Sequence, residues 1–239
     1  MNFNSADISG RGGSKKRPSR RVVAFDLDGV LADFPSGFGR EAERRLGIRI
    51  GSDYQSCNYR WDLGLNPGDF KALKDEIFAT RGFWRGIPEY GHAVAALRAF
   101  IAENPELALI YLSAREPSGF VLKETQLWLS SRELLAPGAT VILVEHAAQK
   151  AQVVNAAGIS WLVDDTPSVV TSCAEHAKSY LLLQPWNLRN GRIVDGRQEV
   201  DLPLETVKSL GEFLALVSGE RRHGLSDEGE KGDFVIGGC

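Results

Sequence analysis

Two aspartates that directly follow a short apolar run constrain this chain more than any other feature. Residues 22–25, with the sequence VVAF, are rich in β-branched and aromatic side chains, which is typical of a buried strand. Asp26 and Asp28 stand at the end of this strand, and Gly29 allows a sharp exit. Side chains two positions apart on an extended segment point the same way, so both carboxylates aim at one point. Their mutual repulsion is relieved when a divalent cation binds there.

Such a motif also occurs as a simple solvated turn, so it needs partners elsewhere in the chain. The rest of the chain alternates between predicted strands and predicted helices, which can carry such partners. We expect strands at 107–112, 140–144, 161–163 and 179–183, and helices at 90–103, 120–135, 147–157, 167–176 and 202–217. Strands that alternate with helices predict an α/β fold, a doubly wound and mostly parallel sheet with right-handed crossovers.

The segment between the first strand and this alternating region has a different character. Helical spacing of apolar residues at 36–46 and 69–80, with aromatic residues at the edges, predicts a small helical cap over residues 34–88. The core is then formed by residues 21–33 and 89–217. Both ends of the chain are polar and rich in glycine, and we expect flexible tails at 1–20 and 218–239.

Charge is unevenly distributed along the chain, whose formal net charge is −3. Residues 1–21 hold six basic residues and one aspartate, a balance of +5 that leaves −8 on the rest. An acidic body is not suited to tracking nucleic acid, so we expect contact with nucleic acid only through the basic tail.

The chain has the composition of a cytoplasmic protein. No apolar run approaches the roughly 18 residues that span a membrane, and the N-terminus lacks the apolar segment of a signal peptide. The three cysteines, Cys57, Cys173 and Cys239, are far apart and odd in number, so we expect reduced thiols.

Polar residues recur where the predicted strands end. Ser113 follows one strand, Asp164 and Asp165 follow another, and Lys150 lies at the start of a helix after a third. The carboxyl ends of neighbouring strands meet in a doubly wound sheet. Several carboxylates together favour a hard cation such as Mg²⁺, while a lysine and a hydroxyl suit a phosphate group.

The order of these residues resembles that of haloacid dehalogenase-type phosphohydrolases. The matching features are DLDGV at 26–30, Ser113 at a strand end, Lys150, and the aspartate pair at 164–165. The resemblance extends over about residues 21–185 and implies a phosphatase on a Rossmann-like core.

The resemblance also implies a role for each residue. Asp26 would be the nucleophile that forms an aspartyl phosphate, and Asp28 the acid that protonates the leaving oxygen and then activates water. Mg²⁺ would be bound by Asp26, the backbone carbonyl of Asp28 and Asp164, with Asp165 as a further direct or water-mediated ligand. Lys150 would pair with the phosphate and with Asp26.

Two longer stretches resemble the 5′(3′)-deoxyribonucleotidase group, the C-type 5′-nucleotidases. They are DLDGVLADFPSGFGR at 26–40 and GFWRGIPEYGHAVAAL at 82–97. In that group, aromatic residues of the cap hold the nucleobase, which implies that Phe34, Trp61 and Trp84 line a base pocket. Each of these aromatics also fits a second interpretation, packing in the core of the cap.

One triplet departs from that group, which usually has Thr-Ser-Pro at this place. Ser113, Ala114 and Arg115 resemble instead the 3′-phosphatase domain of phage-type polynucleotide kinases. We expect all three to lie at the phosphate, although Arg115 is as well suited to pairing with an acid. Residues 184–187, QPWN, follow the last core strand, where they can contact the active-site loop, and we expect Trp186 to pack.

The first functional hypothesis is therefore an Mg²⁺-dependent phosphatase that hydrolyses a small phosphomonoester, a nucleoside monophosphate. A polynucleotide 3′-phosphatase is the second hypothesis. A catalytically silent phosphate-binding or scaffold protein on the same fold is the third, and the intact pair Asp26 and Asp28 argues against it, since binding alone needs no second aspartate.

Overall fold

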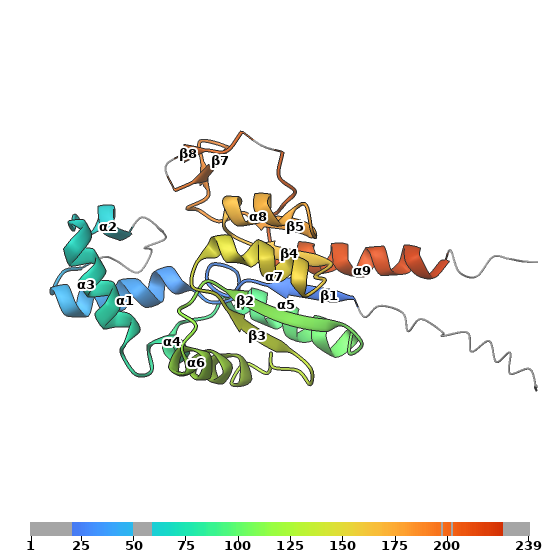
Figure 1. The fold of residues 1–239 in the computed structure, drawn as a ribbon, viewed down its shortest axis with the longest axis horizontal. Helices are drawn as coiled ribbons and strands as arrows, with labels where there is room; N and C mark the ends of the chain where they lie inside the picture. Colours follow the sequence, from blue (N-terminus) through green and yellow to red (C-terminus); the bar gives the residue numbers. More distant parts are fainter. Residues whose placement is uncertain (1–20, 50–58, 197, 202, 227–239) are drawn as a thin grey trace, which may run out of the picture.

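A parallel sheet forms the centre of the molecule (Figure 1). The computed structural model describes residues 21–49, 59–196, 198–201 and 203–226. Within them, the sheet has six strands in the order β3-β2-β1-β4-β5-β9, and all neighbours are parallel. The strands are β1 (Val22–Phe25), β2 (Ala108–Ser113), β3 (Thr140–Leu143), β4 (Trp161–Asp164), β5 (Lys178–Leu182) and β9 (Thr206–Val207).

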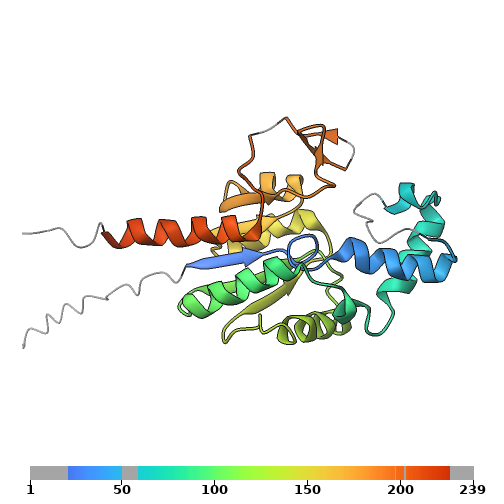
Figure 2. The ribbon, with the colours of Figure 1, turned by 180° about the vertical axis from the view of Figure 1, so that it is seen from behind.

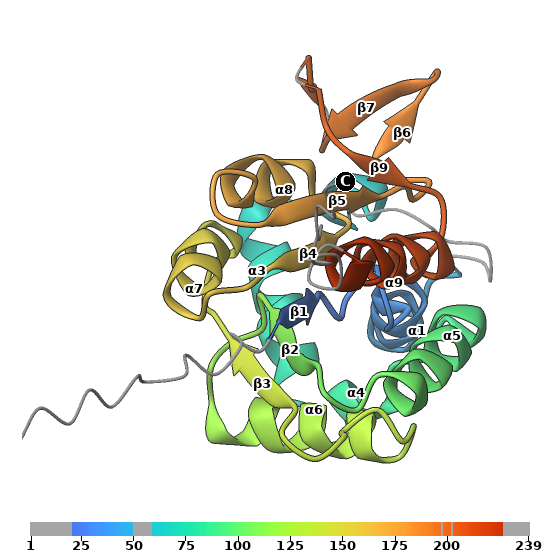
Figure 3. The same cartoon turned by 90° about the vertical axis from the view of Figure 1, so that its right-hand side faces the viewer.

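Helices cover both faces of this sheet, which confirms the doubly wound α/β prediction (Figure 3). One face carries α5 (Gly91–Glu103), α6 (Gly119–Ser130) and α9 (Leu210–Ser226), and the other carries α7 (Lys150–Ala156) and α8 (Pro167–Cys173). The side chains of β1 alternate between the faces. Val23 and Phe25 belong to the core with α5, α6 and α9, and Ala24 belongs to the core with α7 and α8. A strand buried on both faces explains the continuous apolar run in the sequence.

A group of short helices lies beyond the carboxyl end of β1 (Figures 1 and 2). It consists of α1 (Phe34–Leu46), α2 (Tyr59–Asp62), α3 (Pro67–Phe78) and α4 (Phe83–Gly86), and we refer to it as the cap. The chain leaves the core at Asp33 and returns at Pro88, where the Asp33 N–H donates to the Pro88 carbonyl over 2.8 Å. The two connections between cap and core therefore lie side by side.

Capping residues explain where the two longest cap helices begin. The Asp33 side chain accepts a hydrogen bond from the Ser36 N–H at the start of α1, and Asn66 does the same for Asp69 at the start of α3. Helix α1 ends at Gly47, which has a left-handed φ of 65°. Aromatic residues of the two helices pack together, with the centre of the Phe38 ring 6.2 Å from that of Phe70 and 6.4 Å from that of Phe78.

The region after β5 differs from the prediction. A helix was expected from residue 202, but Thr206 and Val207 form the edge strand β9, and α9 begins only at Leu210 and runs to Ser226. The reason is a tertiary contact, because the backbone of β9 pairs with β5, where the Leu181 N–H donates to the Glu205 carbonyl over 2.8 Å. A small antiparallel sheet that was not predicted projects from the core before β9. Its strands are β6 (Leu188–Arg189), β7 (Arg192–Asp195) and β8 (Gln198–Glu199).

Several predictions concern residues outside the described ranges. The tails at 1–20 and 227–239, together with Cys57 and Cys239, lie there. Residues 218–226, expected to be part of the C-terminal tail, are helical. Cys173 is a buried free thiol. Among the helices of the described residues, none combines the length and apolar character needed to cross a membrane.

Candidate active site

Two of the predicted site residues, Asp26 and Asp164, lie at the ends of neighbouring strands. Asp26 follows β1 directly, and Asp164 is the last residue of β4; both are buried. The Asp26 N–H continues the pairing of the strands by donating to the Val163 carbonyl over 3.0 Å. Strand order reverses between β1 and β4, and in doubly wound sheets the crevice at such a point is where ligands bind.

Three carboxylates converge in this crevice. Asp26, Asp164 and Asp165 each offer one oxygen, and these oxygens lie within 4.8 Å of one another. The Lys150 ammonium lies among them, with its Nζ 2.9 Å from Oδ1 of Asp26 and 2.7 Å from Oδ2 of Asp164. We call these three aspartates the carboxylate cluster. The sequence placed all four residues at strand ends or at the start of a helix, and the fold brings them together.

Burial and like charges perturb the protonation of this cluster. Burial, together with the charges of Asp164, Asp165 and Asp28, raises the pKa of Asp26 well above its usual value, against the opposing effect of Lys150. Burial and Asp164 raise the pKa of Asp165 to about 7. Burial lowers the pKa of Lys150, but Asp164 and Asp26 outweigh it and raise the pKa overall. One ammonium thus faces three carboxylates and leaves an excess of negative charge.

The donor set of the cluster fits a divalent cation. It offers carboxylate oxygens only, which hard cations such as Mg²⁺ prefer, and a cation would balance the buried negative charge of the deprotonated carboxylates.

Gly29 is required at its position by two features. Its φ is +85°, a left-handed conformation that side chains other than glycine rarely adopt. A Cβ atom built there would lie 2.2 Å from Oδ2 of Asp165. The loop after β1 therefore packs its backbone directly against a carboxylate of the cluster.

Asp28 lies beside the cluster, but its carboxylate has a different partner. Both of its oxygens accept hydrogen bonds from Arg115, whose Nη2 lies 2.7 Å from Oδ1 and whose Nε lies 2.8 Å from Oδ2. The Ser113 hydroxyl is 3.5 Å from Oδ2 of Asp28. Of the two roles expected for Arg115, the structure thus shows the ion pair with an acid. Metal binding by Asp28, predicted for its backbone carbonyl, stays a prediction.

A cavity of about 530 Å³ lies next to the cluster and is lined by residues of both the core and the cap. The core contributes mostly polar residues to it, and the cap contributes aromatic residues, one lysine and one aspartate. The core residues that line it include Asp26, Asp28, Ser113, Ala114, Arg115, Lys150 and Asp165, and the cap residues are Phe34, Tyr59, Lys74, Asp75, Phe78 and Trp84.

Trp84 lines the cavity, as the sequence predicted, but its ring is packed on both faces. Trp84 is only 2% exposed, and its ring packs against Phe34 and Phe78, with the Arg115 guanidinium 4.9 Å from the ring centre. A stacking residue needs a free face, and Trp84 has none. Phe34 and Phe78 are only partly buried at the cavity. The side chain of Trp61 lies outside the described part of the structure.

Three residues after β5 contact the site. The sequence indicated that residues 184–187 can contact the active-site loop, but it did not predict their hydrogen bonds. The Trp186 indole N–H donates to Oδ2 of Asp165 over 2.7 Å, and the Asn187 amide donates to the Asp165 carbonyl over 2.8 Å. The Gln184 amide donates to the Gly29 carbonyl over 2.5 Å. The expectation that Trp186 only packs was therefore incomplete. The available signal was the position of these polar residues directly after a core strand.

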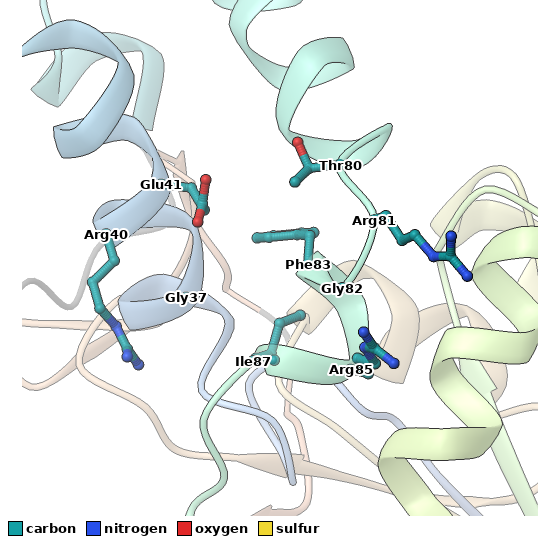
Figure 4. Close-up of a pocket in the computed structure, with 10 residues that line it drawn as sticks. Gly37, Arg40, Glu41, Thr80, Arg81, Gly82, Phe83, Arg85 and Ile87 are labelled. Atoms are coloured by element: carbon teal, nitrogen blue, oxygen red, sulfur yellow. The ribbon is translucent and has the colours of Figure 1, made fainter.

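A second cavity, of about 510 Å³, lies on the other side of the cap connections, between α1 and residues 80–87 (Figure 4). It contains none of the carboxylates of the cluster. Arg40, Arg81 and Arg85 border it, but they point in separate directions and do not converge on one point. Arg85 also approaches Glu124, at 3.7 Å.

Comparison with known proteins shows the fold. No family model and no curated protein matches this sequence. The L-2-haloacid dehalogenase of Xanthobacter autotrophicus matches with a TM-score of 0.54 and 19% identity, over 84% of this chain and 99% of that chain. The HAD hydrolase YfnB of Bacillus subtilis, bound to magnesium, matches with a TM-score of 0.52 and 12% identity, over 83% and 98%. A HAD family hydrolase of Deinococcus radiodurans R1 with bound phosphate and sodium matches with a TM-score of 0.52 and 16% identity, over 84% and 96%. The chain thus has the fold of the haloacid dehalogenase-type hydrolases.

Proposed function

We propose that this protein is an Mg²⁺-dependent phosphomonoesterase that hydrolyses nucleoside monophosphates through an aspartyl phosphate. The observation that carries the proposal is the carboxylate cluster with Lys150 at its centre and Asp28 beside it. This chemistry needs a cation, a nucleophile and a proton donor. The oxygens of the cluster, Asp26 and Asp28 are the residues that support these three parts.

Each residue then has a defined task. A carboxylate oxygen of Asp26 attacks phosphorus, the bond between phosphorus and the ester oxygen breaks, and Asp28 gives its proton to the departing oxygen. Water then attacks the phosphorus of the aspartyl phosphate and gives a proton to Asp28. The bond between phosphorus and the Asp26 oxygen breaks, so that inorganic phosphate is released and the Asp26 carboxylate is restored. Lys150 holds Asp26 in place, at 2.9 Å, and adds positive charge beside the phosphate.

Asp26, Asp164 and Asp165 are the residues that would hold Mg²⁺, together with the Asp28 backbone carbonyl. When bound, the ion neutralises negative charge on the phosphate oxygens. Ser113 is buried at the cavity and offers a hydroxyl to the same group.

Dehalogenation is the alternative that the Xanthobacter autotrophicus enzyme raises. A halide leaves carbon without taking up a proton, so that reaction does not need Asp28 as an acid. The presence of Asp28 next to the cluster therefore favours phosphate ester hydrolysis.

The cavity favours a nucleotide as the substrate. Phe34 and Phe78 lie on its cap side and are only partly buried, so an aromatic base can contact their exposed parts, and the nearby Lys74 offers a partner to an anionic group. Its volume of about 530 Å³ is in the range of small-ligand pockets. The polynucleotide 3′-phosphatase remains the second candidate, because Ser113, Ala114 and Arg115 match the triplet of that domain.

A phosphate-release assay on a panel of esters tests the proposal. The panel comprises deoxyribo- and ribonucleoside 5′- and 3′-monophosphates and a 3′-phosphorylated oligonucleotide, each with Mg²⁺ and with EDTA, and L-2-chloropropionate assayed for chloride release. We expect Mg²⁺-dependent phosphate release, with nucleoside monophosphates preferred. Chloride release without phosphate release contradicts the proposal, and absence of both favours the scaffold interpretation.

A further inference from the structure

The segment 184–187 connects the two loops that form the site. From this one segment, Gln184 reaches the Gly29 carbonyl, while Trp186 and Asn187 reach the side chain and the backbone carbonyl of Asp165. The segment is itself held in shape, because the Asn187 side chain accepts a hydrogen bond of 2.9 Å from the Gln184 N–H. The segment therefore forms one connected unit, and this unit is hydrogen-bonded to both the loop after β1 and the loop after β4.

Asp165 depends on this unit more than its neighbour does. Asp164 is fixed by the Thr166 N–H, at 2.9 Å, and by Lys150, at 2.7 Å. The Asp165 carboxylate has one short hydrogen bond within the described residues, the 2.7 Å bond from Trp186, and a longer one of 3.4 Å from the Thr166 hydroxyl. Gly29 packs against the same carboxylate, and a Cβ built at Gly29 would come closest to the oxygen that Trp186 binds, Oδ2.

The small sheet forms hydrogen bonds with Asn187, the neighbour of Trp186, and with the start of α8. The Val194 N–H on β7 donates to the Asn187 carbonyl over 2.9 Å, and the Ser168 N–H at the start of α8 donates to the Asp195 side chain over 3.2 Å. The unpredicted sheet is thus attached to the core next to the residue that holds Asp165.

We propose that Trp186 is a positioning residue, whose indole N–H holds the Asp165 carboxylate in the orientation that completes the carboxylate cluster for a divalent cation. The inference rests on the proposed function, since it takes the cluster to be the cation site. Partners of metal ligands orient them, and losing such a partner commonly weakens metal binding by about 10–100-fold.

The variant Trp186→Phe tests this, because it removes the donor and keeps an aromatic ring. Trp128→Phe is the matched control: the Trp128 indole N–H donates a hydrogen bond of 2.8 Å to the Ile87 carbonyl, far from the cluster in sequence and not in contact with it. Binding of Mn²⁺ alone, followed by the electron paramagnetic resonance signal of the free ion, measures affinity without any substrate. We expect Trp186→Phe to weaken Mn²⁺ binding by about tenfold or more, and Trp128→Phe to leave it unchanged.

A second measurement uses the unmodified protein and does not depend on how the variants fold. The chain has five tryptophans, so nitrogen-15 labelling of tryptophan gives a simple set of indole N–H signals. We expect the Trp186 signal to shift when Mg²⁺ is added and the Trp128 signal to stay in place.

The outcomes separate this inference from the proposed function. If wild-type protein binds Mn²⁺ and Trp186→Phe binds it equally well, or if the Trp186 signal does not respond to Mg²⁺, the positioning role is wrong while the metal site stands. If the wild-type protein binds neither ion, the proposed function itself is wrong.

Discussion

Arg115 holds the Asp28 carboxylate with two parallel hydrogen bonds, of 2.7 and 2.8 Å. The guanidinium is fixed in turn by the Thr125 hydroxyl, at 2.9 Å, and by the Trp84 ring, whose centre is 4.9 Å away. Arg115 is 1% exposed. A rigid cation therefore determines where the proposed acid of the reaction points.

We predict that Arg115→Lys lowers kcat by about 10²-fold, because lysine cannot form the two parallel bonds and the Asp28 carboxylate loses its orientation. Steady-state kinetics on a nucleoside monophosphate measure the change. Arg132→Lys is the control, since Arg132 also pairs with a carboxylate, that of Glu89, and also lies over a tryptophan ring, that of Trp128. Similar losses in both variants would show that the effect is general destabilisation.

Asp28→Asn should affect substrates according to their leaving group. The alkoxide of a nucleoside needs a proton when it departs, whereas nitrophenolate does not. We expect kcat/KM, which reports the transfer of the phosphoryl group to Asp26, to fall much further for a nucleotide than for p-nitrophenyl phosphate. Equal losses on both substrates would exclude Asp28 as the general acid.

Metal-free protein should lose stability as the pH rises. The pKa of Asp165 is raised from 3.8 to about 7 in the folded state, and that of Asp26 is raised in the same direction. A raised carboxyl pKa contributes stability below the unfolded value, and this contribution is lost as the pH rises through about 7. Thermal unfolding in EDTA between about pH 5 and about pH 8 should show the decline.

Mg²⁺ should oppose that decline, because the ion binds the deprotonated carboxylates. We expect it to raise Tm more at about pH 8 than at about pH 6. Asp165→Asn should reduce this difference. A Tm that rises with pH in EDTA, or does not respond to Mg²⁺ at either pH, would contradict the charge balance described for the cluster.

Phe78→Ala should distinguish nucleotides from small esters. Phe78 lies at the cap side of the cavity, where it is placed to contact a base, so its removal should raise KM for a deoxynucleoside monophosphate and spare p-nitrophenyl phosphate. The wild-type enzyme is compared in parallel on a 3′-phosphorylated oligonucleotide. A higher kcat/KM for the oligonucleotide would support the polynucleotide 3′-phosphatase instead.

The positions of the main site residues followed from the sequence because they depend on topology. Asp26 and Asp164 come directly after apolar runs, and parallel strands place their carboxyl ends together. The fold class followed from the same alternation of strands and helices. Lys150 could be placed as well, since its helix follows β3 closely.

Contacts between distant segments could not be predicted in this way. The hydrogen bond from Trp186 to Asp165 spans 21 positions and depends on a loop without any periodic pattern. From the sequence, Arg115 could bind the phosphate or pair with an acid. The packing of its side chain against Trp84 and Thr125 decides between the two, because it points the guanidinium at Asp28. Trp84 had the right type for stacking on a base, but its burial depends on how the cap closes on the core.

The central claim, that Asp26 is the nucleophile of an Mg²⁺-dependent phosphatase, is tested most directly by comparing phosphate release by the wild type and Asp26→Asn. Both are assayed on a nucleoside monophosphate with Mg²⁺ and with EDTA, after circular dichroism shows that the variant is folded. We predict release by the wild type only with Mg²⁺, and a loss of about 10⁴-fold or more in the variant. A folded variant that keeps more than about one hundredth of the wild-type rate would contradict the account.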